Sequence, residues 1–239
     1  MASINDYIRK AKQGLFVLTK YLDSQELSEL HTIKDQALSI YYNGGYELAE
    51  RQRAIIIPRG DTPPKEEEFE IALLEIQLAD PNASISHRHV LGTLMSFGFK
   101  RDNLGDIIVS DNIYLFTTTD MAPYIITQLT SINHIPTKVS IKENNILPIT
   151  IKEEELNINV ASLRLDAVIA KVLNKARSDT QELITQGLVQ VNHIEKTNSS
   201  YFVKEGDLIS IRHFGRITIG EVLKTTKKDR LVLSVKVKH

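Results

Sequence analysis

The sequence contains no cysteine among its 239 residues. Disulfide bonds, zinc–thiolate sites and cysteine nucleophiles are therefore excluded, and the composition fits a reducing compartment. No apolar run approaches the roughly 20 residues that a membrane-spanning helix needs, and the first residues lack the apolar core of a signal peptide. We therefore expect a cytoplasmic protein that does not associate with membranes.

The sequence also lacks the motifs on which the common classes of enzyme depend. It shows no glycine-rich cofactor loop, no catalytic triad in a recognisable context and no metal-ligand spacing. His87 and His89 stand two apart at a predicted helix start, where their side chains would point about 200° apart and could not chelate one metal ion. We therefore expect no metal, no cofactor and no enzymatic activity.

A formal net charge of −1 conceals an uneven distribution of charge. Residues 157–239 carry 14 lysines and arginines against 8 aspartates and glutamates, whereas residues 1–156 carry 15 against 22. Polyanions such as RNA are held mainly by lysine and arginine, which neutralise phosphates and release counterions. The last third of the chain is therefore the candidate nucleic-acid-binding module.

This module opens with a predicted helix over residues 164–176. Apolar residues recur there at the spacing of one helical stripe, namely Leu165, Val168, Ile169, Val172 and Leu173. Steps of seven and four positions bring Lys171 and Lys175 to within about 20° of Arg164 on a second face. The spacing thus predicts a helix that presents an apolar core face and a cationic face.

A second helix and a small sheet are predicted to follow. Ser178 and Gln181 fit a capping box that would start the helix one residue after the serine, and Gly187 is placed to end it. Alternating apolar residues then predict strands over 189–191 and 208–212. The expected module is two helices packed on a small curved sheet.

The run from Arg164 to Arg212 resembles an S-four domain, the RNA-binding fold named after a small-subunit ribosomal protein. The matching motifs are Arg-Leu-Asp at the start of the first helix, Arg-Ser before the second, Gly-Leu-Val-x-Val-Asn and Glu-Gly-Asp-x-Ile-x-Ile-Arg. The resemblance implies that the following residues contact structured RNA, chiefly its backbone: Arg164, Lys171, Lys175, Arg177, Ser178, Gln181, Lys204 and Arg212. Reversing the charges of Lys175 and Arg177 is then expected to weaken RNA binding and leave the fold intact.

Two positions in this run need separate interpretation. A similar Arg-Leu-Asp motif carries the catalytic aspartate of pseudouridine synthases, but too few residues follow Arg212 to form their catalytic domain. We interpret Asp166 as a first-turn carboxylate that the helix dipole stabilises. His193 stands where the family commonly has glycine, and histidine is less tolerant of a positive φ.

Residues 69–150 are predicted to form a ferredoxin-like βαββαβ domain of the kind that RNA-recognition domains share. The elements are expected at residues 69–78, 87–97, 106–109, 112–116, 121–131 and 137–141. Tyr114 and Phe116 lie two apart on one strand, as base-stacking aromatics would. The surrounding segment is acidic and lacks the glycine–aromatic signature of RNA-recognition domains, so we interpret both rings as packed rather than RNA-binding.

Residues 1–68 are predicted to be mainly helical as far as about Ala49, because leucines and isoleucines recur there at workable helical spacings. A segment rich in proline, glycine and charge follows over residues 58–68, and Ala54–Ile57 is a candidate short strand before it. We find no motif for catalysis or binding in this first part.

The stretch from Asp61 to Asp111, joined to an S-four domain in a chain of this size, resembles the YlmH family of bacterial proteins. The resemblance implies an RNA-binding middle domain and a protein associated with the large ribosomal subunit and peptidyl-tRNA in quality control after stalling. Arg88, Lys100 and Arg101 are candidates for a second phosphate contact there, although solvated surface charge is the alternative.

The expected protein is therefore α+β, with a helical N-terminal part at 1–68, an RNA-recognition-like domain at 69–150 and an S-four domain at 157–239. It is expected to bind ribosomal or transfer RNA as a monomer. Two other functions stay open: an RNA-modifying enzyme that recruits substrate through its S-four domain, and a protein-interaction adaptor linked to cell division.

Overall fold

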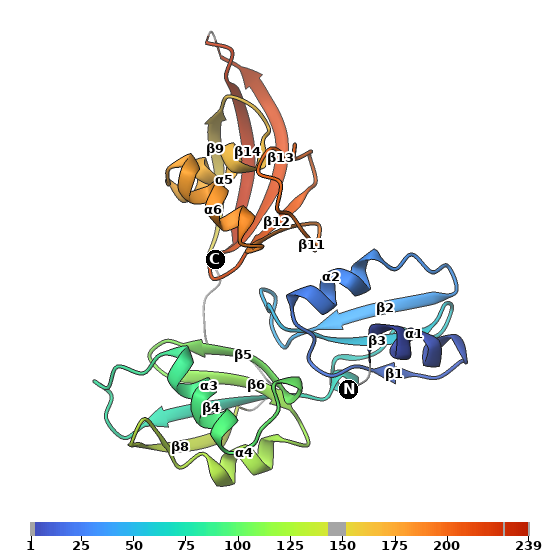
Figure 1. Cartoon of the computed structure of the whole chain (residues 1–239), viewed down its shortest axis with the longest axis vertical. Helices are drawn as coiled ribbons and strands as arrows, with labels where there is room; N and C mark the ends of the chain where they lie inside the picture. Colours follow the sequence, from blue (N-terminus) through green and yellow to red (C-terminus); the bar gives the residue numbers. More distant parts are fainter. Residues whose placement is uncertain (1–2, 143–151, 227, 239) are drawn as a thin grey trace. The chain divides into compact units, whose positions relative to one another are not determined.

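The computed structural model describes residues 3–142, 152–226 and 228–238, and the chain forms two compact units, 1–148 and 149–239. Helices and sheets occur in both units, which confirms the α+β class (Figure 1). The predicted boundary at residue 68 lies inside the first unit, and the predicted domain end at residue 150 lies outside the described residues. No described helix is both long and apolar enough to cross a bilayer.

The N-terminal part combines the predicted helical structure with a small antiparallel sheet, most of which the sequence analysis did not predict. Its elements are α1 (Ile4–Lys12), β1 (Val17–Leu18), α2 (Ser24–Thr32), β2 (Leu38–Asn43), β3 (Arg53–Pro58) and the 3-10 turn η1 (Glu66–Phe69). The strands lie in the order β1-β3-β2, and the candidate strand at 54–57 is confirmed as the centre of β3.

Local signals explain why the helical pattern breaks in this part. Gly14, at φ +85°, follows the end of α1, where a left-handed residue cannot continue the helix. Asp23 and Glu26 form a capping box that starts a new helix, with the Asp23 carboxylate accepting from the Glu26 backbone N–H at 2.9 Å. Ile40 and Tyr42 then belong to β2, where branched and aromatic side chains are favoured.

The middle of the chain has the predicted ferredoxin-like order. Its elements are β4 (Ile71–Leu78), α3 (His87–Ser96), the 3-10 turn η2 (Arg101–Asn103), β5 (Leu104–Val109), β6 (Ile113–Thr118), α4 (Ala122–Gln128), β7 (Ser131–Ile132) and β8 (Ile135–Ile141). The antiparallel strand order β5-β6-β4-β8-β7 adds one short edge strand to the expected four. One face of the sheet packs with the helices in a core that includes Leu74, Ile76, Leu94, Leu115 and Ile125.

The N-terminal part packs against the middle sheet through aromatic rings and a buried carboxylate. Tyr46 stacks on the fully buried Phe116, with ring centroids 5.2 Å apart and an interplanar angle of 13°. The Asp106 carboxylate accepts from the Tyr46 hydroxyl at 2.9 Å and from the backbone N–H groups of Glu50 and Arg51 at 2.7 and 3.1 Å. Burial raises the pKa of Asp106, although these hydrogen bonds act in the opposite direction.

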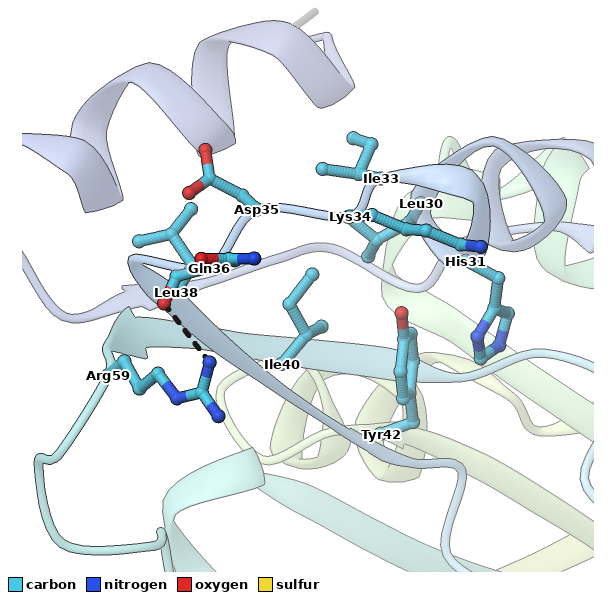
Figure 2. Close-up of a pocket in the computed structure, with 10 residues that line it drawn as sticks. All are labelled: Leu30, His31, Ile33, Lys34, Asp35, Gln36, Leu38, Ile40, Tyr42 and Arg59. Carbon is cyan, nitrogen blue, oxygen red and sulfur yellow. Dashed lines mark hydrogen bonds between the residues drawn. The ribbon is translucent and has the colours of Figure 1, made fainter.

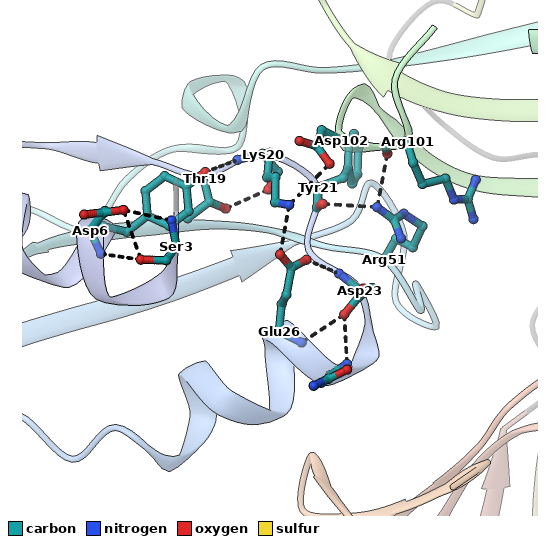
Figure 3. Close-up of polar contacts among 12 residues, drawn as sticks. Ser3, Asp6, Thr19, Lys20, Tyr21, Asp23, Glu26, Arg51, Arg101 and Asp102 are labelled. Carbon is teal, nitrogen blue, oxygen red and sulfur yellow. Dashed lines mark hydrogen bonds and ion pairs between the residues drawn. The ribbon is translucent and has the colours of Figure 1, made fainter. Parts of the chain in front are cut away.

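A second group of polar contacts crosses the same junction (Figure 3). The Arg51 guanidinium donates to the carbonyl oxygens of Tyr21, Leu104 and Arg101 at 3.1, 2.9 and 3.1 Å. The Lys20 ammonium bridges Glu26 and Asp102, at 2.9 and 3.3 Å. Because these contacts join distant parts of the sequence, residues 3–142 behave structurally as one folded unit.

We expect Gly45→Ala to destabilise the first unit by about 2 kcal/mol, because a Cβ atom there would overpack the junction. The added carbon would stand 2.3 Å from Phe116 Cδ1, and the residue has φ +95°, which alanine disfavours. Urea unfolding followed by tyrosine fluorescence would measure the loss. Gly60→Ala is the control, since Gly60 has a similar φ of +99° but no atom within 4 Å of the added carbon, and an equal loss in both variants would contradict the packing explanation.

The second unit consists of two helices on one face of a six-stranded antiparallel sheet (Figure 1). Its elements are β9 (Glu153–Val160), α5 (Leu165–Leu173), α6 (Arg177–Thr185), β10 (Val189–Val191), β11 (Ile194–Glu195), β12 (Leu208–Ile211), β13 (Gly215–Thr225) and β14 (Leu231–Lys238). The two predicted helices and both predicted strands are present. The sheet is larger than expected, because β9 pairs with β14 from Val160↔Leu231 to Glu153↔Lys238, so the structured unit already includes Glu153, ahead of the predicted start at residue 157.

Candidate nucleic-acid interface

The helical hairpin α5–α6 has the predicted apolar face but different ends. Leu165, Val168 and Ile169 are buried in the core of the second unit, as their spacing predicted. Asn174, at φ +51°, ends α5, so the helix stops at Leu173 and does not reach residue 176. Lys175 therefore lies in the connection between the helices, and the predicted common helical face with Arg164 and Lys171 does not form.

The second helix begins at Arg177, two residues earlier than predicted. Ala176 is its N-cap residue and provides no side-chain cap. The predicted Ser178–Gln181 capping box was wrong, because the Ser178 hydroxyl donates to the Asp179 carboxylate at 3.1 Å and Gln181 turns toward Asp166. The start of this helix is therefore not marked by a polar side-chain cap.

The Asp166 carboxylate joins the two helices. It is fully buried and accepts hydrogen bonds from three side chains. Arg164 donates through Nε and Nη2 at 3.1 and 3.0 Å, Arg177 donates through Nη2 to both oxygens at 3.0 and 2.9 Å, and Gln181 donates through Nε2 at 2.8 Å. The Thr180 hydroxyl lies within hydrogen-bond distance of the carbonyl oxygens of Arg177 and Asp166, at 2.9 and 3.2 Å. One aspartate thus positions three of the predicted RNA-binding side chains.

The same contacts hold Asp166 in its ionised form. Burial alone would raise its pKa, but hydrogen bonds from Arg164, Gln181 and Arg177 outweigh burial and lower the pKa to about 2. Both carboxylate oxygens are occupied by cationic or amide donors, so this group is poorly placed to act as a nucleophile or a general base. The interpretation of Asp166 as a first-turn carboxylate was incomplete, because the residue is the electrostatic centre of the hairpin.

The hairpin presents a positive surface in spite of this buried negative charge. Arg164 and Arg177 keep 31% and 53% of their side-chain surface exposed, so their guanidinium groups together outweigh the single charge of Asp166. Lys171 and Lys175 are exposed, and no described residue forms a hydrogen bond or ion pair with either ammonium group. Such cations can bind phosphate oxygens without first breaking an internal contact.

Arg177 is therefore a poor position for a charge reversal. A glutamate there would place a second carboxylate beside the buried Asp166 and remove one of its donors. The expectation that Lys175→Glu with Arg177→Glu leaves the fold intact does not agree with this geometry. Lys171 and Lys175 are the two positions at which charge can be reversed without disturbing the hairpin.

The two remaining S-four candidates lie on either side of β12. Lys204 is exposed in the turn before the strand, where Asp207 accepts from its backbone N–H at 2.8 Å. Arg212 is exposed directly after the strand, and its N–H donates to Leu188, which follows α6. Lys204 and Arg212 are therefore separated by the length of β12.

The β10–β11 turn contains the two residues that the sequence singled out for positive φ. Asn192 and His193 have φ values of +51° and +65°, as in the tight turns that match the twist of a hairpin. We expect His193→Gly to stabilise the second unit by about 1 kcal/mol, because glycine adopts this conformation without steric cost. Thermal unfolding of the full chain would measure the gain, and a lower stability would show that contacts of the imidazole outweigh the backbone strain.

The candidate patch in the first unit is not compact. Arg88 lies in the first turn of α3 and Lys100 follows its far end, so roughly 12 Å of helix separates them. Both are exposed, whereas Arg101 is half-buried at the junction, where its carbonyl oxygen accepts from Arg51. A contact of Arg88, Lys100 and Arg101 with RNA stays a prediction, and it would have to extend along the helix.

The sheet face that stacks bases in RNA-recognition domains is covered in this protein. Phe116 and Tyr114 are 0% and 5% exposed, which confirms that both aromatics are packed. Tyr46 occupies the position over Phe116 that a base would need, and the Tyr114 hydroxyl donates to Glu75 at 3.2 Å. Any RNA contact of this unit must therefore use its helices, loops or N-terminal part.

A shallow hollow of about 400 Å³ lies in the N-terminal part, between α2 and β2 (Figure 2). His31 stacks on Tyr42 along its wall, with ring centroids 4.3 Å apart. The carboxylate that lines the hollow, Asp35, is paired with Lys12 at 2.8 Å. The two cations that line it, Lys34 and Arg59, lie at opposite ends of the hollow. These groups do not converge on one point, and no group of three metal-ligating side chains occurs among the described residues.

The sequence analysis missed the role of Asp166 as the shared partner of three side chains, and it missed Phe202. The clustering of donors on Asp166 depends on the angle between α5 and α6, which residue spacing does not reveal. Phe202 is 60% exposed beside Arg164. The run Tyr201-Phe202-Val203 contains a usable signal, because a buried valine predicts that the preceding ring in an extended segment faces solvent.

Comparison with known proteins identifies both predicted modules. Residues 64–147 match the family model described as "Putative RNA-binding domain in YlmH", and residues 163–209 match the model described as "S4 domain". A curated relative, the "Ribosome-associated protein quality control protein P2" of Bacillus subtilis (strain 168), is 38% identical over 218 residues, which cover 89% of this chain and 84% of the relative. A solved structure titled "Cell division protein ylmH from Streptococcus pneumoniae" has a similar fold, with a TM-score of 0.50 and 20% identity over 59% of this chain and 93% of that chain.

The fold and the basic hairpin thus define a two-module protein in which a YlmH-type RNA-binding domain precedes an S-four domain. The extent of the similarity to the Bacillus subtilis relative goes further than shared modules. The chain belongs to the YlmH family.

Proposed function

We propose that this protein is a non-enzymatic, cytoplasmic RNA-binding factor that docks as a monomer on ribosomal or transfer RNA. It would associate with the large ribosomal subunit. It would act in the quality control of stalled complexes that carry peptidyl-tRNA. The observation that carries the proposal is the α5–α6 hairpin, where Asp166 positions Arg164 and Arg177 and where Lys171 and Lys175 are exposed. The name of the Bacillus subtilis relative supports a role at the ribosome.

Docking follows from the chemistry of these side chains. Guanidinium and ammonium groups bind phosphate oxygens, which orient a protein on RNA without reading the base sequence. Because the guanidinium groups are held by Asp166 before RNA arrives, less side-chain freedom is lost on binding. Specificity would then come from the shape of the RNA more than from its bases.

Ultraviolet crosslinking in cells, followed by sequencing of the bound RNA, tests this proposal. We expect crosslinks concentrated in large-subunit ribosomal RNA and in transfer RNA, and their loss when Lys171 and Lys175 are both replaced by glutamate. Crosslinks spread over messenger RNA, or unchanged in the variant, would contradict docking through the hairpin.

Two further experiments address the other functions. Partners that co-purify with the protein after nuclease treatment would favour an adaptor that acts through protein contacts. A new modified nucleoside, found by mass spectrometry after incubation of bulk RNA with the protein and common methyl donors, would contradict the absence of catalysis.

A further inference from the structure

We propose that Phe202 stacks on an unpaired RNA base beside the phosphate-binding cations, so that the second unit binds an irregular or single-stranded element rather than a continuous duplex. This inference rests on the proposed function, because it assigns a nucleotide class to the same site. It starts from an exposed phenylalanine that is not part of the hydrophobic core of the unit. Phe202 is 60% exposed, whereas the next residue, Val203, is 1% exposed and belongs to the core.

Backbone hydrogen bonds place the Phe202 side chain next to that of Arg164. The two residues face each other in an isolated antiparallel bridge. The Leu165 N–H donates to the Tyr201 carbonyl at 2.8 Å, and the Val203 N–H donates to the Leu163 carbonyl at 2.9 Å. The hydrogen bonds therefore flank the bridge, which makes it a non-hydrogen-bonded pair, with Cα atoms about 4.5 Å apart and side chains on the same face.

Arg164 connects this ring to the hairpin. Its guanidinium binds Asp166, which also holds Arg177, so the aromatic ring and two phosphate-binding groups belong to one continuous surface. Lys204 is exposed two residues after Phe202, where an extended chain returns its side chains to the same face. The neighbouring Tyr201 is different, because it is half-buried and the Lys196 ammonium lies 4.7 Å from its ring centroid.

A flat apolar ring between cations is the arrangement that binds unpaired nucleotides. The cations hold the backbone while the ring stacks on a base, and stacking tolerates any base because every base has a π face. A continuous duplex keeps its bases inside the helix and offers the ring only sugar and phosphate edges. A bulge, a loop or a strand end would offer phosphates to the cations and an unpaired base to the ring.

The test compares the full-length protein with Phe202→Ala on two RNA probes: a hairpin with a 2-aminopurine in its unpaired loop, and a perfect duplex of equal length. At about 50 mM salt we expect Phe202→Ala to lose roughly 10-fold in affinity for the hairpin and nothing for the duplex. The slope of affinity against salt should not change, since a stacked ring releases no counterions. Loop 2-aminopurine fluorescence should be quenched by wild type and by Phe202→Trp but not by Phe202→Ala.

The controls separate this inference from the proposed function. Phe16→Ala removes a similarly exposed ring, 52% accessible, from the first unit, and this variant should bind both probes as wild type does. Equal affinity and equal quenching for wild type and Phe202→Ala would overturn the stacking role while the hairpin contacts stand. If wild type binds neither probe, or if Lys171→Glu with Lys175→Glu binds as wild type does, the proposed function itself fails and the inference fails with it.

Discussion

Replacing Lys171 and Lys175 together by glutamate is expected to weaken RNA binding roughly 100-fold at about 0.1 M salt, with the fold unchanged. Both ammonium groups are exposed and no described residue pairs with them, so the folded state loses no internal contact. Each phosphate contact that disappears should also lower the slope of log affinity against log salt by about one. Fluorescence anisotropy with labelled RNA over a range of salt concentrations measures both quantities.

The matched control for this charge reversal is Lys10→Glu with Lys138→Glu. Both lysines are exposed, both lie in the first unit, and the change in net charge is the same. If the control weakens binding as much as the hairpin variant does, general electrostatic attraction would explain the result. An unchanged salt slope in the hairpin variant would remove α5–α6 from the interface.

Asp166→Asn is expected to destabilise the second unit by about 3 kcal/mol at neutral pH. The substitution leaves two guanidinium groups without their shared carboxylate, and it removes a buried charge that three donors compensate. RNA binding should weaken as well, because Arg164 and Arg177 are no longer held in place. Hydrogen exchange at the amides of α5 and α6 in the full chain measures the loss of stability where it arises.

The pH dependence of this effect has a definite sign. Folding lowers the pKa of Asp166 from 3.8 to about 2. The ionised carboxylate therefore stabilises the folded state above about pH 4, by about 2 kcal/mol, and this contribution is lost as the pH falls toward 2. The difference in stability between wild type and Asp166→Asn should shrink over that interval. Asp179→Asn, at an exposed position of α6, should show little difference at any pH, and a constant difference for Asp166→Asn would contradict the ion-pair explanation.

Much of the fold could be predicted from the sequence where one local signal dominates. Apolar spacing gave the buried face of α5, Gly187 marked the end of α6, and alternation marked β10 and β12. The middle domain was predicted for the same reason, since each of its strands is short, apolar and bounded by turn residues. Its packed aromatics followed from the acidic surroundings of Tyr114 and Phe116.

The remainder depends on contacts between distant residues. The N-terminal leucines have helical spacing, but Leu18 lies in β1 and Leu22 forms a bridge with Gln52, so tertiary pairing overrides the local pattern. In the candidate site, the basic residues and Asp166 were visible in the sequence, whereas the contacts that join them were not. Asp166 lies 11 residues before Arg177 and 15 before Gln181, and only the packing of α5 on α6 brings the three together.

Sedimentation of the tagged protein through a sucrose gradient of cell lysate, at low and moderate salt, tests the central claim most directly. Wild type should migrate with the large ribosomal subunit, and the Lys171→Glu, Lys175→Glu variant should stay at the top of the gradient, with Lys10→Glu, Lys138→Glu migrating as wild type does. Wild type at the top of the gradient, or a hairpin variant that still migrates with the subunit, would contradict docking on the ribosome through the α5–α6 hairpin.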